Sequence, residues 1–418
     1  MRDRFLLHLT NHQMQRPCQS LVAAEVPPQG ETYRDGSAKC QASKTPQVFA
    51  GVQAMRGIAA LAVVCGHAVS ARPDMVGPEL AEGALTILAS GVDIFFVISG
   101  FIIATTAAAQ HDPLNFVLRR AVRIYPVYWL TLLAAFVSSC WIALAPGERP
   151  ALDTGTIFAW TYPNWYVGPA WSLAFELHFY AVVAIILAIK PNRLFEILFA
   201  WLGLVIVALY FRIQLGICSH PLVLEFGAGV GIAYLLINRG LRFSPRVVAC
   251  SAGLFFAGWY WIFVHGATDP QFARVPTYGL GAGLLIHAVV SAEIEGRSFS
   301  PVLQYLGKIS YSLYMVHYPL VKWIANYDRP WLLSVVGTVI VLILFSIGLA
   351  AAMHILIEEP ILRWGRRLSL MRRSQTSDAP KREGTMLPTS KNEKTSARQG
   401  PASARMPASG ILNVGSPE

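Results

Sequence analysis

Two residues that could do chemistry lie inside one hydrophobic stretch of the chain. The stretch covers residues 49–69, reads FAGVQAMRGIAALAVVCGHAV, and contains Arg56 and His67, 11 positions apart. This spacing is close to three whole turns of an α-helix, so both side chains lie on one helix face, about 16 Å apart along the axis. A histidine titrates near neutral pH and can act as a general base, whereas an arginine can hold an anion. The alternative is that each side chain extends to the nearer headgroup layer without a chemical role.

Three other apolar segments carry polar residues that could join this site. GVDIFFVISGF contains Asp93, WSLAFELHFY contains Ser172 and Glu176, and SYSLYMVHYP contains Tyr314 and His317. Within each of the last two segments the named residues share a helix face, because they are three or four positions apart. Either carboxylate could orient a histidine base and stabilise its charged form. The alternatives are that Asp93 caps its helix and that Glu176 pairs with an arginine for structure alone.

A pair of arginines is suited to hold phosphate groups. Arg120 and Arg123 lie three positions apart in RRAVRIYPVYW, and two such guanidinium groups can address neighbouring phosphates by bidentate contacts. The alternative is that they are ordinary cytoplasmic loop charges. No metal is expected, because no span carries two histidines four positions apart or a cluster of histidine and cysteine.

Composition places these residues in a membrane protein. Hydrophobic residues make up 54% and charged residues 14% of the 418 residues, and the mean hydropathy is +0.46. These values exclude an ordinary soluble domain and predict an all-α, polytopic membrane protein. Judged against the roughly 20 apolar residues that a bilayer span needs, about ten segments qualify: 48–70, 83–107, 125–145, 169–189, 194–213, 219–237, 246–265, 275–292, 309–326 and 331–357.

The loop charges predict the orientation. With the N-terminus inside, the short cytoplasmic loops hold ten lysine and arginine residues, and the outer loops hold four, or five if Arg212 is counted. This bias favours a cytoplasmic N-terminus and C-terminus, with residues 146–168 outside. The predicted depths then fall into two groups, an outer one of His67, Asp93 and Glu176, and an inner one of Arg56, Arg120 and Arg123.

The chain outside the spans predicts two extensions. Residues 1–47 are expected to be a disordered cytoplasmic extension, 48–362 the membrane domain, and 363–418 a basic, mostly disordered cytoplasmic tail. The formal net charge of +10 would favour nucleic acid as a partner of a soluble protein. Here much of the charge lies in loops and tails, so it indicates membrane topology and lipid headgroups, and no nucleic acid is expected.

Five motifs occur in an order that resembles a known family. The R-x10-H stretch, GVDIFFVISGF, RRAVRIYPVYW, WSLAFELHFY and SYSLYMVHYP follow one another within residues 49–364. Together they resemble the acyltransferase-3 family of integral membrane acyltransferases, and look most like its branch that O-acetylates bacterial exopolysaccharides.

The resemblance implies a donor, an acceptor and residue roles. The donor is cytoplasmic acyl-CoA, expected to be acetyl-CoA, and the acceptor is a hydroxyl group, commonly on a sugar. The residues that match the family pattern are Arg56 and His67 as its essential pair, Arg120 and Arg123 as its R-x-x-R motif where the CoA phosphates could bind, Glu176 as its acidic position, and His317 as a recurring position.

The leading hypothesis is a multi-pass O-acyltransferase of the bacterial inner membrane that modifies an exported or envelope polysaccharide. His67 would act as a general base or carry the acyl group transiently. The expected partners are membrane lipid and the sugar acceptor, and a homo-oligomer stays open. One alternative is a transporter or flippase for a lipid-linked sugar, although no internal repeat is evident. The other is an acyltransferase that acts on a small molecule or a lipid.

Overall fold

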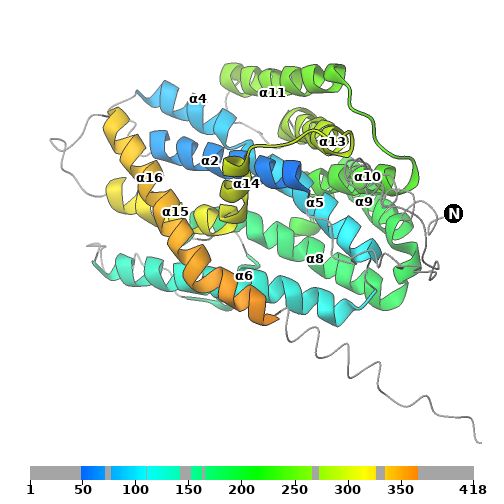
Figure 1. Ribbon diagram of the computed structural model, residues 1–418, viewed down its shortest axis with the longest axis horizontal. Helices are drawn as coiled ribbons and strands as arrows, with labels where there is room; N and C mark the ends of the chain where they lie inside the picture. Colours follow the sequence, from blue (N-terminus) through cyan, green and yellow to red (C-terminus); the bar gives the residue numbers. More distant parts are fainter. Residues whose placement is uncertain are drawn as a thin grey trace, which may run out of the picture. The chain divides into compact units, whose positions relative to one another are not determined.

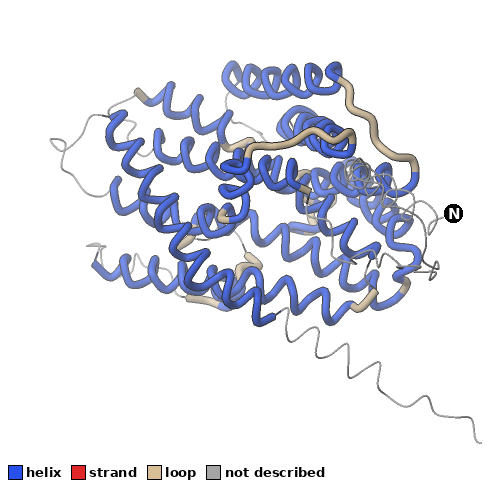
Figure 2. The backbone as a smooth tube through the Cα atoms, in the orientation of Figure 1, coloured by secondary structure: helices blue, strands red, loops and turns tan. Residues whose placement is uncertain are grey.

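The computed structural model describes the membrane domain almost completely. Every regular element in the part of the chain that it describes is a helix (Figures 1 and 2). The predicted extension 1–47 and nearly all of the predicted tail 363–418 lie outside the described residues, so those two expectations stay predictions. The described residues are 49–70, 77–109, 111–141, 152–161, 164, 166–265, 273–325 and 335–365.

The helices agree with the predicted spans. Within the described residues, eight helical segments are long and apolar enough to cross a membrane: Ala50–Ser70, Ala81–Ala109, Pro113–Cys140, Gly168–Ile189, Pro191–Tyr210, Pro245–His265, Val275–Ile294 and Val339–Gly365. The shorter α10 (Val223–Asn238) and α15 (Ser310–Ala325) account for the sixth and ninth predicted spans. The prediction of an all-α, polytopic membrane protein is confirmed.

The individual elements are bounded as follows. The longer helices are α2 (Ala50–Ser70), α4 (Pro78–Leu88), α5 (Gly91–Ala109), α6 (Pro113–Trp141), α8 (Trp171–Ile189), α9 (Leu194–Tyr210), α11 (Pro245–His265), α13 (Leu280–Ile294), α14 (Pro301–Lys308) and α16 (Val335–Met353). The short elements are α7 (Thr154–Phe158), η1 (Gly168–Ala170), η2 (Pro191–Arg193), η3 (Gly216–Ser219), η4 (Val275–Gly279) and η5 (His354–Glu358).

The third span begins earlier than the sequence predicts. Helix α6 begins at Pro113 rather than near residue 125, so Arg120 and Arg123 lie within the helix and not in a loop. Asp112 starts the helix, because its side chain accepts hydrogen bonds of 3.1 Å from the backbone N–H groups of Leu114 and Asn115. Capping and a proline at the first position favour a helix start regardless of hydropathy. A hydropathy window therefore misses these first turns.

Helix α2 is fixed at its N-terminus by another helix. The two carboxylate oxygens of Glu293 in α13 each accept a hydrogen bond of 2.7 Å, from the backbone N–H groups of Ala50 and Gly51. These N–H groups have no partner within their own helix, and a carboxylate also complements the positive end of the helix dipole. The contact sets the position of the helix that carries Arg56 and His67.

Helices α5 and α10 cross at two glycines. A Cβ atom on Gly100 would lie 2.1 Å from the carbonyl oxygen of Phe226, and one on Gly229 would lie 2.1 Å from that of Val97. Small residues allow helices to approach closely inside a membrane. In Figure 1 the two helices lie within the same part of the bundle as α8. This close crossing brings the polar residues of α5 towards those of α10.

Candidate active site

Polar residues from five helices converge on one cavity. Six of the nine residues nominated from the sequence line it, and apolar side chains of α5, such as Phe95 and Ile102, form further wall. We call it the arginine cavity, because three arginines and one carboxylate dominate its charge. The nominated residues that line it are Arg56 from α2, Arg120 and Arg123 from α6, Ser172 and Glu176 from α8, and Tyr314 from α15.

Glu176 lies among the arginines rather than with the histidine. Its carboxylate accepts hydrogen bonds from the hydroxyl of Ser99, at 2.9 Å, and from that of Tyr180. It interacts electrostatically with Arg56 and Arg120, but no direct ion pair with an arginine forms within the described residues. Of the outer group predicted from the sequence, Glu176 alone therefore shares this cavity with the inner group of arginines.

The arginines keep donor capacity for a ligand. Arg56 donates to the hydroxyl of Ser310 at 3.1 Å. The guanidinium of Arg120 lies 5.5 Å from the ring centres of Phe116 and Tyr180, which stabilises a cation by the ring quadrupoles. Among the described residues, the buried Nε atom of Arg120 has no hydrogen-bond partner. A buried donor without a partner is costly, and a bound anion would satisfy it.

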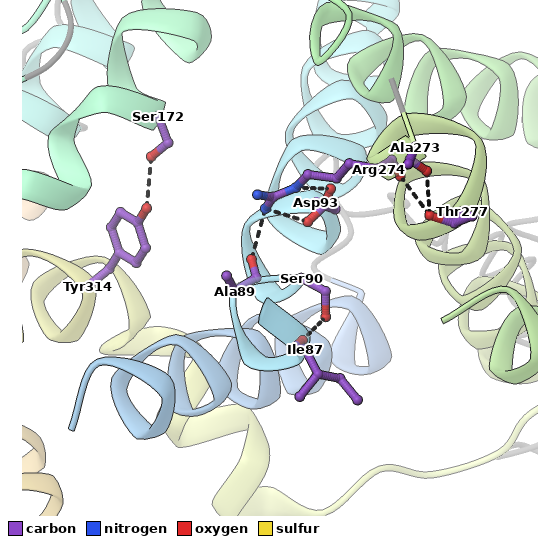
Figure 3. Close-up of polar contacts among 9 residues, drawn as sticks. All are labelled: Ile87, Ala89, Ser90, Asp93, Ser172, Ala273, Arg274, Thr277 and Tyr314. Atoms are coloured by element: carbon purple, nitrogen blue, oxygen red, sulfur yellow. Dashed lines mark hydrogen bonds and ion pairs between the residues drawn. The ribbon is translucent and has the colours of Figure 1, made fainter. Parts of the chain in front are cut away.

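One face of α15 leads from the arginine cavity to His67. Ser310 at the start of the face contacts Arg56. The hydroxyl of Tyr314, one turn later, lies 3.0 Å from that of Ser172 (Figure 3). The ring centre of Tyr314 is 5.9 Å from that of His317, which in turn contacts His67. Tyr314 and His317 thus share a polar face, as the sequence predicts, and Ser310 extends that face by one turn.

The neighbour of His67 is a histidine. His317 Nε2 lies 3.4 Å from His67 Nδ1, and their ring centres are 5.1 Å apart. Within the described residues, no carboxylate contacts His67. Glu176 and Asp93, the two carboxylates proposed from the sequence to orient His67, contact other partners instead.

Asp93 is bound by an arginine that the sequence assigns to an outer loop. Arg274 Nε donates to one carboxylate oxygen at 2.8 Å, and Arg274 Nη2 donates to the other at 2.7 Å (Figure 3). Nη2 also donates to the carbonyl of Ala89 at 3.0 Å. Asp93 is completely buried. Nothing in the local sequence distinguishes Arg274 from a loop arginine, but a buried carboxylate in a span requires a cation nearby.

Glu225 is a second buried carboxyl group beside this ion pair. It is 1% exposed in α10 and lies beside Asp93 and Arg274. A Cβ atom on Gly279 would lie 2.8 Å from its Cγ, so the backbone of η4 packs closely against it. An ionisable residue within a predicted span was a signal that could have identified it. We call Asp93, Glu225 and Arg274 the Asp93 cluster.

The segment between the third and fourth spans packs on α6. In its short helix α7, Thr156 and Ile157 accept hydrogen bonds through their carbonyl oxygens from Tyr128 and Trp129. Asp153 caps α7 by accepting a hydrogen bond of 2.7 Å from the Thr156 N–H, and this bond holds the pKa of the Asp153 carboxyl below its ordinary value. The segment predicted to lie outside is thus anchored to the helix that carries Arg120 and Arg123.

Comparisons with known proteins match this arrangement to acyltransferases. A family model described as an acyltransferase domain matches residues 49–355. The exopolysaccharide production protein ExoZ of Rhizobium meliloti (strain 1021) is 32% identical over 301 residues, which cover 67% of this chain and 92% of ExoZ. The acyltransferase MdmB of Streptomyces mycarofaciens is 27% identical over 383 residues, which cover 78% of this chain and 96% of MdmB.

A third relative is a longer protein. The O-acetyltransferase OatA of Staphylococcus aureus (strain NCTC 8325 / PS 47) is 24% identical over 367 residues, which cover 77% of this chain and 58% of OatA. No solved structure matches the chain significantly. Among the described residues, no group of three or more histidine, cysteine, aspartate or glutamate side chains is placed to hold a metal ion.

Proposed function

This chain belongs to the acyltransferase-3 family, and from that premise we propose that it transfers an acetyl group from acetyl-CoA to a sugar hydroxyl of an exported bacterial polysaccharide. It is a membrane acyltransferase; the donor, the acceptor and the residue roles are the proposal. The observation that carries it is the arginine cavity, joined to His67 by one polar face of α15.

The donor end of the site is the arginine cavity. Arg120 and Arg123 would bind phosphate groups of CoA, because guanidinium groups form bidentate contacts with phosphate. The buried Nε of Arg120 would gain the partner that it lacks. The apolar wall formed by α5 suits the less polar remainder of the donor. Arg56, Arg120 and Arg123 exceed the single Glu176 in charge, so the cavity favours an anionic ligand.

The acceptor end is His67. Its Nδ1 lies 2.9 Å from the carbonyl oxygen of Val63, and a carbonyl only accepts, so Nδ1 carries the proton and Nε2 is the basic atom. His67 Nε2 takes the proton of the sugar hydroxyl while the oxygen attacks the thioester carbon. The carbon–sulfur bond then breaks, the proton passes to the CoA sulfur, and the products are the O-acetyl ester and free CoA.

The relatives support the choice of acceptor. ExoZ is named for exopolysaccharide production and OatA for O-acetyl transfer. We place the chain in the bacterial inner membrane with both ends in the cytoplasm, as the loop charges predict. This orientation puts the arginine cavity on the side from which CoA would enter.

The test is transfer of labelled acetyl from acetyl-CoA to O-deacetylated polysaccharide of a deletion strain, by the purified protein in lipid nanodiscs. We expect wild-type protein to transfer the label, and His67→Ala to lower the rate by about 10²–10⁴-fold, the usual contribution of a general base. The matched control is His178→Ala, because His178 lies on α8 beside Trp201 and outside the site.

Three outcomes would count against the proposal. Unchanged acetylation of surface polysaccharide in the deletion strain would show that this polysaccharide is not the acceptor. Transfer at the wild-type rate by folded His67→Ala protein would show that His67 is not the base. An acetyl group trapped on His67 in the absence of acceptor would replace direct transfer by a covalent relay.

A further inference from the structure

The hydrogen bonds of two histidines define their tautomers. His67 Nδ1 lies 2.9 Å from the carbonyl oxygen of Val63, and His317 Nδ1 lies 3.1 Å from that of Leu313. Because each carbonyl can only accept, both Nδ1 atoms are donors, and in the neutral imidazole both Nε2 atoms carry a lone pair.

These tautomers make the contact between the rings directional. The lone pair of His317 Nε2 faces the Nδ1–H of His67 at 3.4 Å, so His67 shares this proton between Val63 and His317. Such three-centre hydrogen bonds are common in proteins. His317 itself is 0% exposed, and the rings of Tyr314 and Tyr318 lie within 5.9 and 6.4 Å of its ring centre. The imidazole of His317, which accepts the hydrogen bond, is therefore held in place by its neighbours.

We propose that His317 is a positioning residue that holds His67 as the Nδ1–H tautomer, and that it accepts a stronger hydrogen bond once His67 has taken a proton. This inference rests on the proposed role of His67 as the base. A carboxylate has the corresponding role in serine-protease triads. Here Asp93 is bound by Arg274, and Glu176 by Ser99 and Tyr180. The imidazole of His317 therefore has the role of orienting the base.

A neutral acceptor suits the surroundings of His67. His317 lies on the buried side of α15 that faces α2, where an ionised carboxylate without a cation would be costly. An imidazole avoids that cost while His67 is neutral. It still provides a lone pair when His67 becomes positively charged. The hydrogen bond between the two rings is then shorter and stronger than between neutral groups.

Three substitutions of His317 test the role. Glutamine can place its amide oxygen near the position of Nε2, asparagine places its oxygen near Nδ1, and leucine provides no acceptor. In the transfer assay we expect His317→Leu and His317→Asn to lower kcat by about 10- to 100-fold, the size of a lost charge-assisted hydrogen bond. We expect His317→Gln to recover at least half of the wild-type kcat, and the KM for acetyl-CoA to stay within about twofold in all three.

The controls separate this inference from the proposed function. Thermal unfolding and size-exclusion chromatography in detergent report folding, and if His317→Leu does not fold, the comparison of glutamine with asparagine still decides. Equal kcat values for folded His317→Gln and His317→Asn would overturn the inference, as would a wild-type kcat for His317→Leu. Activity that is lost in His67→Ala but kept in all His317 variants would leave the proposed function intact and remove only the role of His317.

Discussion

The arginine cavity and the Asp93 cluster are both charged and both inside the bundle, but they differ in how their charges are paired. In the Asp93 cluster, one guanidinium binds both oxygens of Asp93 and a backbone carbonyl. In the arginine cavity, Arg56, Arg120 and Arg123 face one carboxylate, and the described residues form no direct ion pair there. Two ionised carboxylates and one arginine carry one negative charge, so a single proton on the Asp93 cluster would neutralise it. In the arginine cavity, by contrast, three arginines face one glutamate, so positive charge remains in excess.

The difference shows that depth and residue type do not by themselves identify a functional charge. An ionised group inside a membrane protein is stable when it is paired and hydrogen-bonded. The ion pair of Asp93 and Arg274 meets this condition without a ligand. Within the described residues, both carboxyl oxygens of Glu225 and the Nε donor of Arg120 are buried without a hydrogen-bond partner. The arginine cavity combines its unsatisfied donor with an excess of positive charge, so it is the place where an anion would complete the structure, whereas the ion pair of Asp93 and Arg274 is expected to stabilise the contact between α5 and η4.

Removing the excess charge of the arginine cavity should have the largest effect. Each lost charge-assisted contact should weaken donor binding by about 1.5–3 kcal/mol, so Arg120→Ala combined with Arg123→Ala should raise the KM for acetyl-CoA by roughly 10²-fold or more. The measurement is initial rate against donor concentration. The control is Arg119→Ala, because Arg119 is on the same helix but bonds Asn115 and does not line the cavity. A wild-type KM in the double variant would show that both arginines contribute to membrane topology and not to donor binding.

Breaking the Asp93 cluster should instead lower stability. Asp93→Ala breaks the buried ion pair and leaves Arg274 with Glu225 as its neighbouring carboxyl group, and removing one partner of a buried pair costs about 3–5 kcal/mol. We expect a lower midpoint of thermal unfolding in detergent and an unchanged KM for acetyl-CoA. Asp93→Asn combined with Arg274→Gln should recover part of the loss, because neither charge of the ion pair then remains, whereas Glu225 loses its neighbouring cation.

The opposite pattern would reverse the comparison. If Asp93→Asn unfolds at the wild-type temperature but loses most of its kcat, then the carboxylate acts in the chemistry. Its nomination as a catalytic residue from the sequence would then stand, and the ion pair with Arg274 would be a means of positioning it.

How far the sequence predicts the molecule depends on the range of the interactions. The spans were predictable because about 20 apolar residues are a local property, and the polar face of α15 because helical periodicity is local as well. The start of α6 was missed because the cap at Asp112, not hydropathy, determines it. The pairing of Asp93 with Arg274 was missed because it joins residues 181 positions apart.

Most of the residues nominated for the candidate site line one cavity, but their geometry could not be predicted from the sequence. Arg56 and Glu176 were nominated from different spans, and both line the arginine cavity. The partner of the base could not be obtained from sequence, because three nominated residues, Asp93, Glu176 and His317, were chemically able to take that role. Only the packing of α2 against α15 brings His317, and neither carboxylate, to His67.

The smallest expected effect is that of Glu176→Gln on the KM for acetyl-CoA. Whether this KM falls or stays constant shows whether Glu176 only balances the charge of the arginine cavity. Glu176→Gln keeps the shape of the side chain and its hydrogen bonds to Ser99 and Tyr180, but removes the one carboxylate among the described residues that lines the cavity with the three arginines. If the carboxylate only moderates the positive charge of the cavity, an anionic donor should bind more tightly. At an effective dielectric constant of 20, a charge about 8 Å away contributes roughly 2 kcal/mol before screening, so we expect the KM for acetyl-CoA to fall about two- to tenfold. If Glu176 instead supports the base, as one sequence-based hypothesis holds, kcat should fall while KM stays constant. Initial rates over a range of donor concentrations measure both values in the same experiment. A lower kcat at constant KM would show that Glu176 acts in the chemical step although it does not contact His67 directly.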